Sequence, residues 1–153
     1  MIKKIGIAVI IVLGVLQFIR PPKNMGEKIT ENDISLTYGV PEAIHSIIVQ
    51  KCYDCHSNST VYPWYTNVQP VGWWMYKHIE DGKEELNFSE YKTYSEKKAN
   101  HKLEEISELV TEGEMPLASY LWIHRDAKIS REENAMINNW IESLGAKTTP
   151  IPN

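Results

Sequence analysis

The chain has little of several features that define common protein classes. Only two of its 153 residues are cysteine, too few for a disulfide scaffold or a four-cysteine zinc site. It has no excess of positive charge, because 20 acidic against 16 basic residues give a net charge of −4. Nucleic-acid-binding proteins usually carry a basic balance, so we expect no nucleic-acid partner. Convincing strand patterns and internal repeats are also missing from the sequence, which predicts an all-α fold.

One long apolar run is present, and it lies at the N-terminus. The run Ile5–Ile19 follows Lys3 and Lys4 and is broken only by Gln17. A positive start before an apolar block is typical of an export signal or a signal anchor. Without a clear small-residue cleavage motif, a retained anchor helix is favoured, with the rest of the chain outside the cytoplasm. We therefore expect attachment to the inner membrane with the domain facing the periplasm, or a periplasmic protein if the leader is cleaved.

Composition divides the chain into four segments. Residues 1–20 form the signal anchor or signal peptide, and Pro21-Pro22 end any helix there. Residues 21–38 are polar and predict a linker that lets the domain swing. Residues 39–145 carry the helical patterns and predict one domain of four to five helices. Residues 146–153 predict a flexible tail.

Helical periodicity and helix-end signals place the expected elements. Ser130 and Glu133 match a capping box, and Gly113 is placed to end a helix. We expect four helices: from Pro41 through both cysteines, from Pro70 to Gly82, from Ser95 to Glu112, and from Arg131 to Leu144. Between them we expect a loop over 57–70, an irregular stretch over 83–94, a break at 114–116 and a short apolar segment over 117–124.

The most specific motif is Cys52-Tyr53-Asp54-Cys55-His56. Two cysteines three residues apart, followed at once by histidine, form the attachment pattern of c-type haem. On a helical turn both thiols point the same way, so each can add to one vinyl group of the same haem. His56 then lies under the ring and can place an imidazole nitrogen on the iron.

Three other interpretations of the cysteine pair fit less well. A thioredoxin-like redox pair needs a βαβ setting, which the sequence does not predict. A structural zinc site needs four ligands, and Cys52, Cys55 and His56 supply three. A disulfide across two intervening residues would be strained.

A second axial ligand is expected, because an electron carrier usually holds its iron between His and Met or between two His. Met115 is the favoured candidate, since Pro116 biases it away from helix in the predicted break. His78 and His124 are alternatives. His78 lies on an apolar helical stripe and could be a core histidine, whereas His124 could hydrogen-bond a haem propionate or a backbone carbonyl.

With these motifs the chain resembles the bacterial haem-binding domain family, a cytochrome c-like group of the type common in Bacteroidetes. The resemblance covers residues 35–145. It rests on Cys52–His56 followed by Ser57-Asn58-Ser59-Thr60, on Tyr62-Pro63-Trp64-Tyr65, Pro70-Val71-Gly72-Trp73 and Asn87-Phe88-Ser89, and on Met115-Pro116, Tyr120, His124 and Trp140.

The resemblance implies one covalent haem c per chain in a cytochrome c-like bundle, with His56 as proximal and Met115 as distal ligand. It implies no defined reaction. The first hypothesis is a membrane-tethered monohaem cytochrome that passes single electrons between redox partner proteins in the periplasm or inner membrane. The alternatives are a haem peroxidase or its subunit, with His78 or His124 as distal acid–base group, and a gas or redox sensor in which Met115 leaves the iron.

Overall fold

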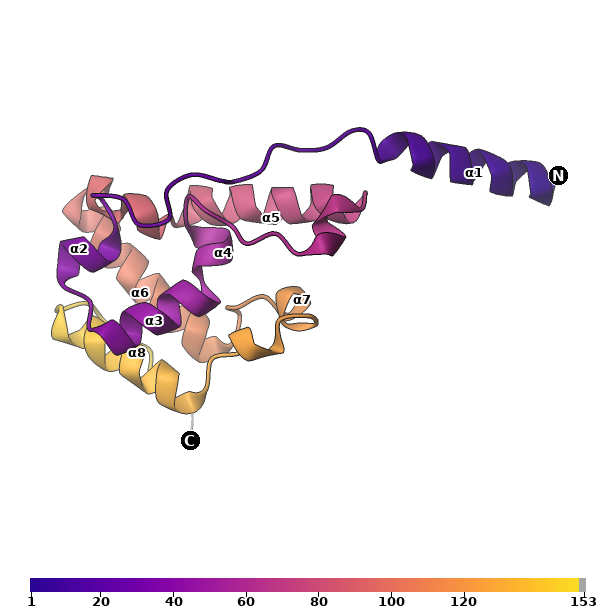
Figure 1. Ribbon diagram of the computed structural model, residues 1–153. Helices are drawn as coiled ribbons and strands as arrows, with labels where there is room; N and C mark the ends of the chain where they lie inside the picture. The colour runs from indigo at the N-terminus through magenta and orange to yellow at the C-terminus, as the bar shows by residue number, and fades with distance from the viewer. Residues whose placement is uncertain (152–153) are drawn as a thin grey trace.

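The computed structural model describes residues 1–151, which fold into helices joined by turns (Figure 1). No β-strand occurs among these residues. The one bridge between extended segments pairs Met25 with Ser59. The predicted all-α class is therefore confirmed.

Four helices of ten residues or more build the domain, and shorter ones connect them. The long helices are α3 (Glu42–Lys51), α5 (Val71–Glu85), α6 (Glu96–Glu112) and α8 (Arg131–Ser143). The short ones are α2 (Ile34–Tyr38), α4 (Tyr53–His56) and α7 (Ala118–Leu121), with 3-10 turns η1 (Trp64–Asn67), η2 (Phe88–Thr93) and η3 (Arg125–Ala127). The expected bundle of four to five helices matches the long helices and misses the short ones.

The strongest helix-end signals were predicted correctly. Ser95 caps α6 through its side chain, and Gly113 ends that helix with φ of 75°, in the left-handed region that glycine adopts without strain. Ser130 and Glu133 form the predicted capping box at the start of α8. These two helices pack against each other.

Two helices differ from the expectation at the cysteine motif. The expected continuous helix through both cysteines is broken at Cys52, where φ of −121° interrupts it between α3 and α4. The next helix, α5, was expected to end at Gly82 and instead continues to Glu85. Gly82 therefore does not stop the helix; it lies where α5 packs against α4.

A buried core lies behind the cysteine motif and holds α4 in place. The ring of Tyr53 stacks on Phe88 with centroids 5.4 Å apart, and its hydroxyl donates a 2.8 Å hydrogen bond to the buried Asp33 carboxylate. Further core side chains come from α3, α6, α8 and η2: Ile44, Ile48, Tyr91, Leu103, Ile137, Trp140 and Ile141. Because Tyr53 sits between Cys52 and Cys55, burial of its side chain fixes the motif against this core.

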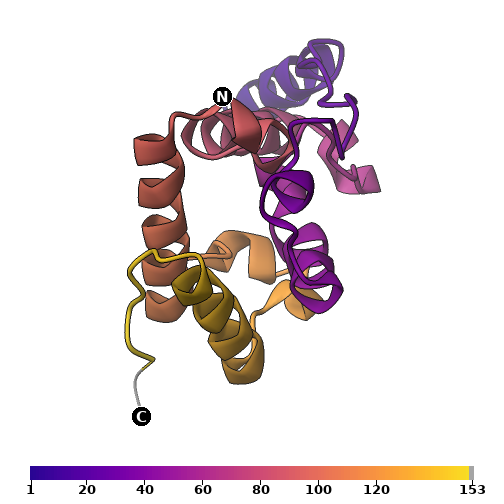
Figure 2. The same ribbon diagram turned by 90° about the vertical axis from the view of Figure 1, so that its left-hand side faces the viewer.

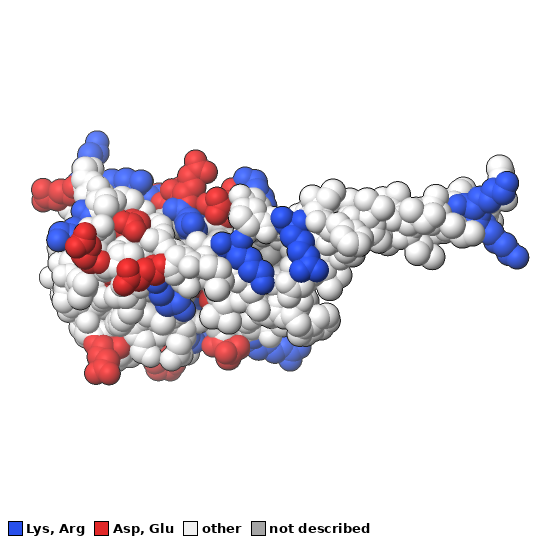
Figure 3. Space-filling model, turned by 45° about the horizontal axis from the view of Figure 1, so that its top comes forward, with Lys and Arg blue, Asp and Glu red and all other residues white. Residues whose placement is uncertain are grey.

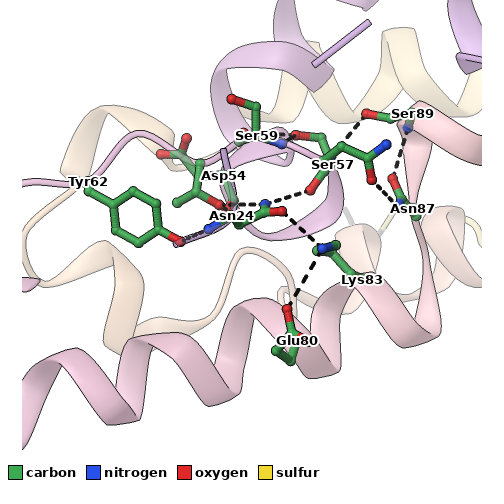
Figure 4. Close-up of polar contacts among 11 residues, drawn as sticks. Asn24, Asp54, Ser57, Ser59, Tyr62, Glu80, Lys83, Asn87 and Ser89 are labelled. Atoms are coloured by element: carbon green, nitrogen blue, oxygen red, sulfur yellow. Dashed lines mark hydrogen bonds and ion pairs between the residues drawn. The ribbon is translucent and has the colours of Figure 1, made fainter. Parts of the chain in front are cut away.

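Residues 21–38 do not form the free linker that the sequence predicted. The backbone of Asn24 accepts a hydrogen bond from Thr60 N, and its side chain donates to the Ser57 carbonyl (Figure 4). Lys83 on α5 donates to the Asn24 side-chain oxygen at 2.9 Å. Residues 34–38 form helix α2, with Ile34 fully buried. A polar composition predicted flexibility, but these polar groups find partners on the domain.

The two ends of the chain differ in their relation to the domain. Helix α1 (Ile2–Leu16) projects away from it and buries none of its residues (Figure 1). Among residues 1–151, no helix combines the length and the hydropathy needed to span a bilayer. At the other end, the expected flexible tail packs on the domain as far as Thr149, whose N–H donates to Ser107 at 2.8 Å. Residues 152–153 of that tail lie outside the described residues.

Candidate haem site

A cavity of about 600 Å³ lies between the helices of the domain. The lining residues come from the end of α3 and from α4, α5, α6, α7 and the segments next to them. Figure 2 shows α5, α6 and the segment carrying α3 and α4 on different sides of the domain. The volume of the cavity lies within the roughly 300–1,000 Å³ that small-molecule and cofactor pockets have. Apolar lining comes from Leu86, Phe88, Ile106, Leu109, Val110, Leu117 and Ile129.

Cys52 and Cys55 both line this cavity as free thiols. Burial raises the pKa of Cys52 to about 12 and that of Cys55 to about 11. Both sulfurs are therefore protonated near neutral pH. Two reduced thiols on the wall of one cavity could each add sulfur and hydrogen across a carbon–carbon double bond of the same ligand.

His56 lines the same cavity, and its ring is oriented by the backbone of α5 and the residue after it. The Nδ1 atom lies 2.9 Å from the Gly82 carbonyl and 3.0 Å from the Leu86 carbonyl. Because carbonyls only accept hydrogen bonds, Nδ1 carries the proton and the lone pair remains on Nε2. Burial lowers the pKa of His56, which favours the neutral ring. A neutral imidazole fixed through Nδ1 is the arrangement that metal-ligating histidines use.

Gly82 allows the close approach of α5 to α4 on which these hydrogen bonds depend. A Cβ atom at this position would lie 2.9 Å from the Cys55 carbonyl oxygen and 3.3 Å from the Cys55 Cβ. Both atoms belong to the cysteine motif and cannot move independently of it. The absence of a side chain at residue 82 therefore positions His56 as well as α5.

We expect Gly82→Ala to destabilise the protein by about 1–2 kcal/mol. Overpacking of a core contact costs about 1–3 kcal/mol, and the higher helix propensity of alanine offsets up to about 1 kcal/mol of it. Thermal unfolding followed by circular dichroism measures the change. Gly14→Ala on α1 is the matched control, because a Cβ atom at residue 14 would meet no other atom within 4 Å. Equal melting temperatures for Gly82→Ala and wild type would contradict this role.

The segment after α6 brings Met115, Pro116 and Leu117 to the cavity wall. The N–H groups of Glu114 and Met115 both donate to the Leu109 carbonyl, at 2.9 and 3.1 Å. The left-handed turn at Gly113 therefore folds the chain back on the end of α6. The predicted break at 114–116 is confirmed, and it brings Met115 into the same cavity as Cys52, Cys55 and His56.

The two alternative histidines lie in different places. His78 lines the cavity; its Nδ1 lies 2.8 Å from the Trp74 carbonyl, and its ring packs on Trp74. His124 is not among the lining residues. Its Nε2 forms a 2.7 Å hydrogen bond with the Tyr65 hydroxyl, and its ring stacks on Tyr120.

Two lysines that the sequence analysis did not single out also line the cavity. Lys51 donates to the carbonyls of Asp126 and Lys128 and forms a 3.0 Å ion pair with Glu133. Lys102, only 9% exposed, pairs with Glu105 at 2.6 Å and with Glu85 at 3.4 Å. The sequence could have indicated that Lys102 is buried. It directly precedes Leu103 and lies three residues after Ala99, and both of these residues are on the apolar face of the predicted helix.

A further polar contact fixes the motif from the other side. The Tyr120 hydroxyl donates a 2.9 Å hydrogen bond to Asp54, the residue between Tyr53 and Cys55. Both residues line the cavity. The contact joins α7 to α4, so the segment that follows Met115 is tied to the cysteine motif.

A small all-α protein with a Cys-x-x-Cys-His motif on the wall of an apolar cavity belongs to the class of haem proteins. A model of the family described as haem-binding domain matches residues 11–143. The match covers most of the chain, so this protein belongs to the haem-binding domain family, as its motifs predicted. Comparisons with curated proteins and with solved structures found no match. The family match includes residues 21–38, which pack on the domain.

Proposed function

We propose that the protein is a monohaem c-type cytochrome that transfers single electrons. The observation that carries this proposal is the meeting of Cys52, Cys55, His56 and Met115 at one cavity of about 600 Å³. When bound, haem supplies an iron that cycles between its ferric and ferrous states. The two thiols would join the haem edge through thioether bonds, and the sulfur of Met115 would complete the ligand set.

The protein's own groups support fixed, six-coordinate ligation. His56 offers Nε2 because two carbonyls hold Nδ1, and these second contacts orient a metal-bound imidazole. The apolar part of the wall suits the face of a haem ring, and an axial methionine raises the reduction potential. Lys51 and Lys102 bring cationic groups to the cavity, each already paired with a carboxylate: Glu133 for Lys51, and Glu85 and Glu105 for Lys102.

The N-terminal sequence supports the same function. Haem is attached to c-type cytochromes outside the cytoplasm, and the Lys3-Lys4 start with an apolar α1 is the pattern of a segment that is exported or inserted. We propose that α1 holds the protein at the inner membrane with its domain in the periplasm. Its redox partners would then be proteins of the periplasm or of that membrane.

A peroxidase is the second candidate function, and the position of His78 favours it. This histidine lines the cavity, so it could act as a distal acid–base group if Met115 left the iron. His124 is a weaker nominee because its Nε2 is bonded to Tyr65. The two functions make opposite demands on Met115: the electron carrier keeps it bound, and the peroxidase needs an open iron position.

The covalent c-type nature can be tested on the full chain, expressed in a host that matures c-type haem. We expect the denatured protein to keep its haem colour and its mass to exceed that of the polypeptide by one haem. The reduced spectrum should be that of a low-spin cytochrome, with slow peroxide turnover. An intact mass equal to the bare polypeptide would refute covalent attachment. A high-spin spectrum with rapid peroxide turnover would favour the peroxidase.

A further inference from the structure

Large apolar side chains are exposed at the end of the domain that α1 joins. Trp64 on η1 and Trp122 after α7 are each 78% exposed, and Ile123 is 64% exposed. Tryptophans are large amphipathic residues that are rarely left this open without a partner. We name this surface the apolar end and define it by Phe18, Ile19, Trp64, Val68, Trp122 and Ile123.

Contacts between neighbouring segments bring these residues to one place. The 2.7 Å hydrogen bond between Tyr65 and His124 ties η1 to the segment that carries Trp122 and Ile123. Gln17 and Gln69 exchange two hydrogen bonds, at 2.9 and 3.1 Å, which join the end of α1 to the turn after η1. The Trp73 indole N–H donates to the Ile19 carbonyl at 2.8 Å. The exit of α1 is thus built into the same surface.

Because α1 leaves the domain at the apolar end, this end faces the environment into which α1 extends. In Figure 1, α1 points away from the domain on the side where α7 and the N-terminus of α5 lie. Figure 3 shows α1 white along its length, with Lys and Arg side chains at its free tip and more of them near its junction with the domain. The cations beside the junction in sequence are Arg20 and Lys23, both exposed. An apolar helix with cations at both ends matches the cross-section of a bilayer.

We propose that the apolar end rests on the lipid bilayer and holds the domain in one orientation at the membrane surface. This inference rests on the proposed membrane attachment through α1. Fifteen residues at a rise of about 1.5 Å make α1 about 22 Å long, shorter than a hydrocarbon core of about 30 Å. A short segment draws its flanking residues into the interface, where tryptophan is enriched and Arg and Lys meet anionic headgroups.

The segment that follows α1 is bonded to the domain, and this fixes the orientation of the domain relative to α1. The chain continues from the apolar end along the domain surface, and its Asn24 bonds with Thr60, Ser57 and Lys83. A flexible tether would let the domain rotate freely above the membrane. Because this segment is fixed, the two contacts with the bilayer, α1 and the apolar end, restrain the same rigid unit.

Hydroxyl-radical footprinting of the full haem-loaded chain tests this inference. The chain is studied in detergent and in vesicles of phosphatidylethanolamine and phosphatidylglycerol, and oxidation is measured by mass spectrometry of its peptides. We expect oxidation of Trp64 and Trp122 to fall several-fold in vesicles. Met136 is the internal reference, because it is exposed on α8, away from the apolar end, and should be oxidised equally in both media.

A vesicle flotation assay on the same sample separates the possible failures. A chain that does not float with the vesicles overturns the membrane attachment and with it this inference. A chain that floats while Trp64 and Trp122 oxidise as fast as in detergent overturns the docked orientation and leaves the anchor standing. Protection that appears only after a redox partner protein is added also overturns it, because the apolar end would then bind protein. The variant Trp64→Glu/Trp122→Glu should keep its haem spectrum and its flotation, and lose the protection of Ile123.

Discussion

A chain in which both Cys52 and Cys55 are replaced by alanine should be recovered without haem and largely unfolded. Without the two thiols, the proposed thioether bonds cannot form, and nothing covalent can keep a haem in the cavity of about 600 Å³. The side chains of Leu86, Ile106 and Leu109 then face water. Burial of each such side chain is worth roughly 1.5–3 kcal/mol, so the exposure of several is comparable with a whole domain stability of about 5–15 kcal/mol. Circular dichroism and urea unfolding of the purified variant measure the loss.

The single variants Cys52→Ala and Cys55→Ala separate attachment from folding. Each keeps one thiol and His56, so each should retain some covalent haem and intermediate stability. A double variant that is haem-free yet shows native helix content and cooperative unfolding would contradict the coupling of haem binding to folding. A double variant that stays coloured through His56 and Met115 alone would show that ligation suffices to hold the cofactor.

Much of the fold was predictable because local signals there were strong. Ser95 and Gly113 bracket α6, and Ser130 with Glu133 starts α8, each through hydrogen bonds within a few residues of sequence. Signals of this kind need no knowledge of the rest of the chain. The break that carries Met115 was also local, since a proline follows a helix-ending glycine.

The misplaced elements depended on tertiary contacts. Gly82 was interpreted as a helix end, yet its role is to leave room for Cys55, whose carbonyl oxygen would lie only 2.9 Å from a Cβ atom at residue 82. Only the packing of α4 on α5 reveals this. The polar segment around Asn24 was interpreted as a linker, because composition does not show that its hydrogen-bond partners lie some 33 to 59 residues away in sequence.

The sequence selected the candidate residues that the structure brings to one cavity, but it did not predict their surroundings. The cysteine motif and Met115 could be selected by spacing and by neighbouring residues. The carbonyls that hold His56 Nδ1 and the pairing of Lys102 with Glu105 could not, since any backbone carbonyl or acidic residue could have served. The choice of candidate ligands rests on the sequence, whereas the orientation of the His56 ring depends on how α5 packs against α4.

Replacement of Met115 by alanine should remove the weak near-infrared band that arises from sulfur-to-iron charge transfer. The variant keeps both cysteines and His56, so under the proposed ligation the haem should stay attached while the iron loses its sixth ligand. We expect high-spin features in the ferric spectrum and a fall in reduction potential on the order of 100 mV or more, part of the ≈ 0.8 V range that axial ligands span. Spectroscopy and potentiometric titration measure both effects.

Two further variants show whether the loss is specific to Met115. Met136→Ala removes another partly exposed methionine, on α8 and outside the cavity lining, and should leave the band and the potential unchanged. His78→Ala should also keep the band, because His78 lines the cavity without being the ligand that we propose. A band that survives Met115→Ala, or a low-spin spectrum in wild type that only His78→Ala converts to high spin, would replace Met115 with a different sixth ligand. The N–H groups of Glu114 and Met115 both donate to the Leu109 carbonyl, and these backbone hydrogen bonds do not need the Met115 side chain. The Met115→Ala variant should therefore keep its fold, so that a change in its spectrum reports the change in ligation.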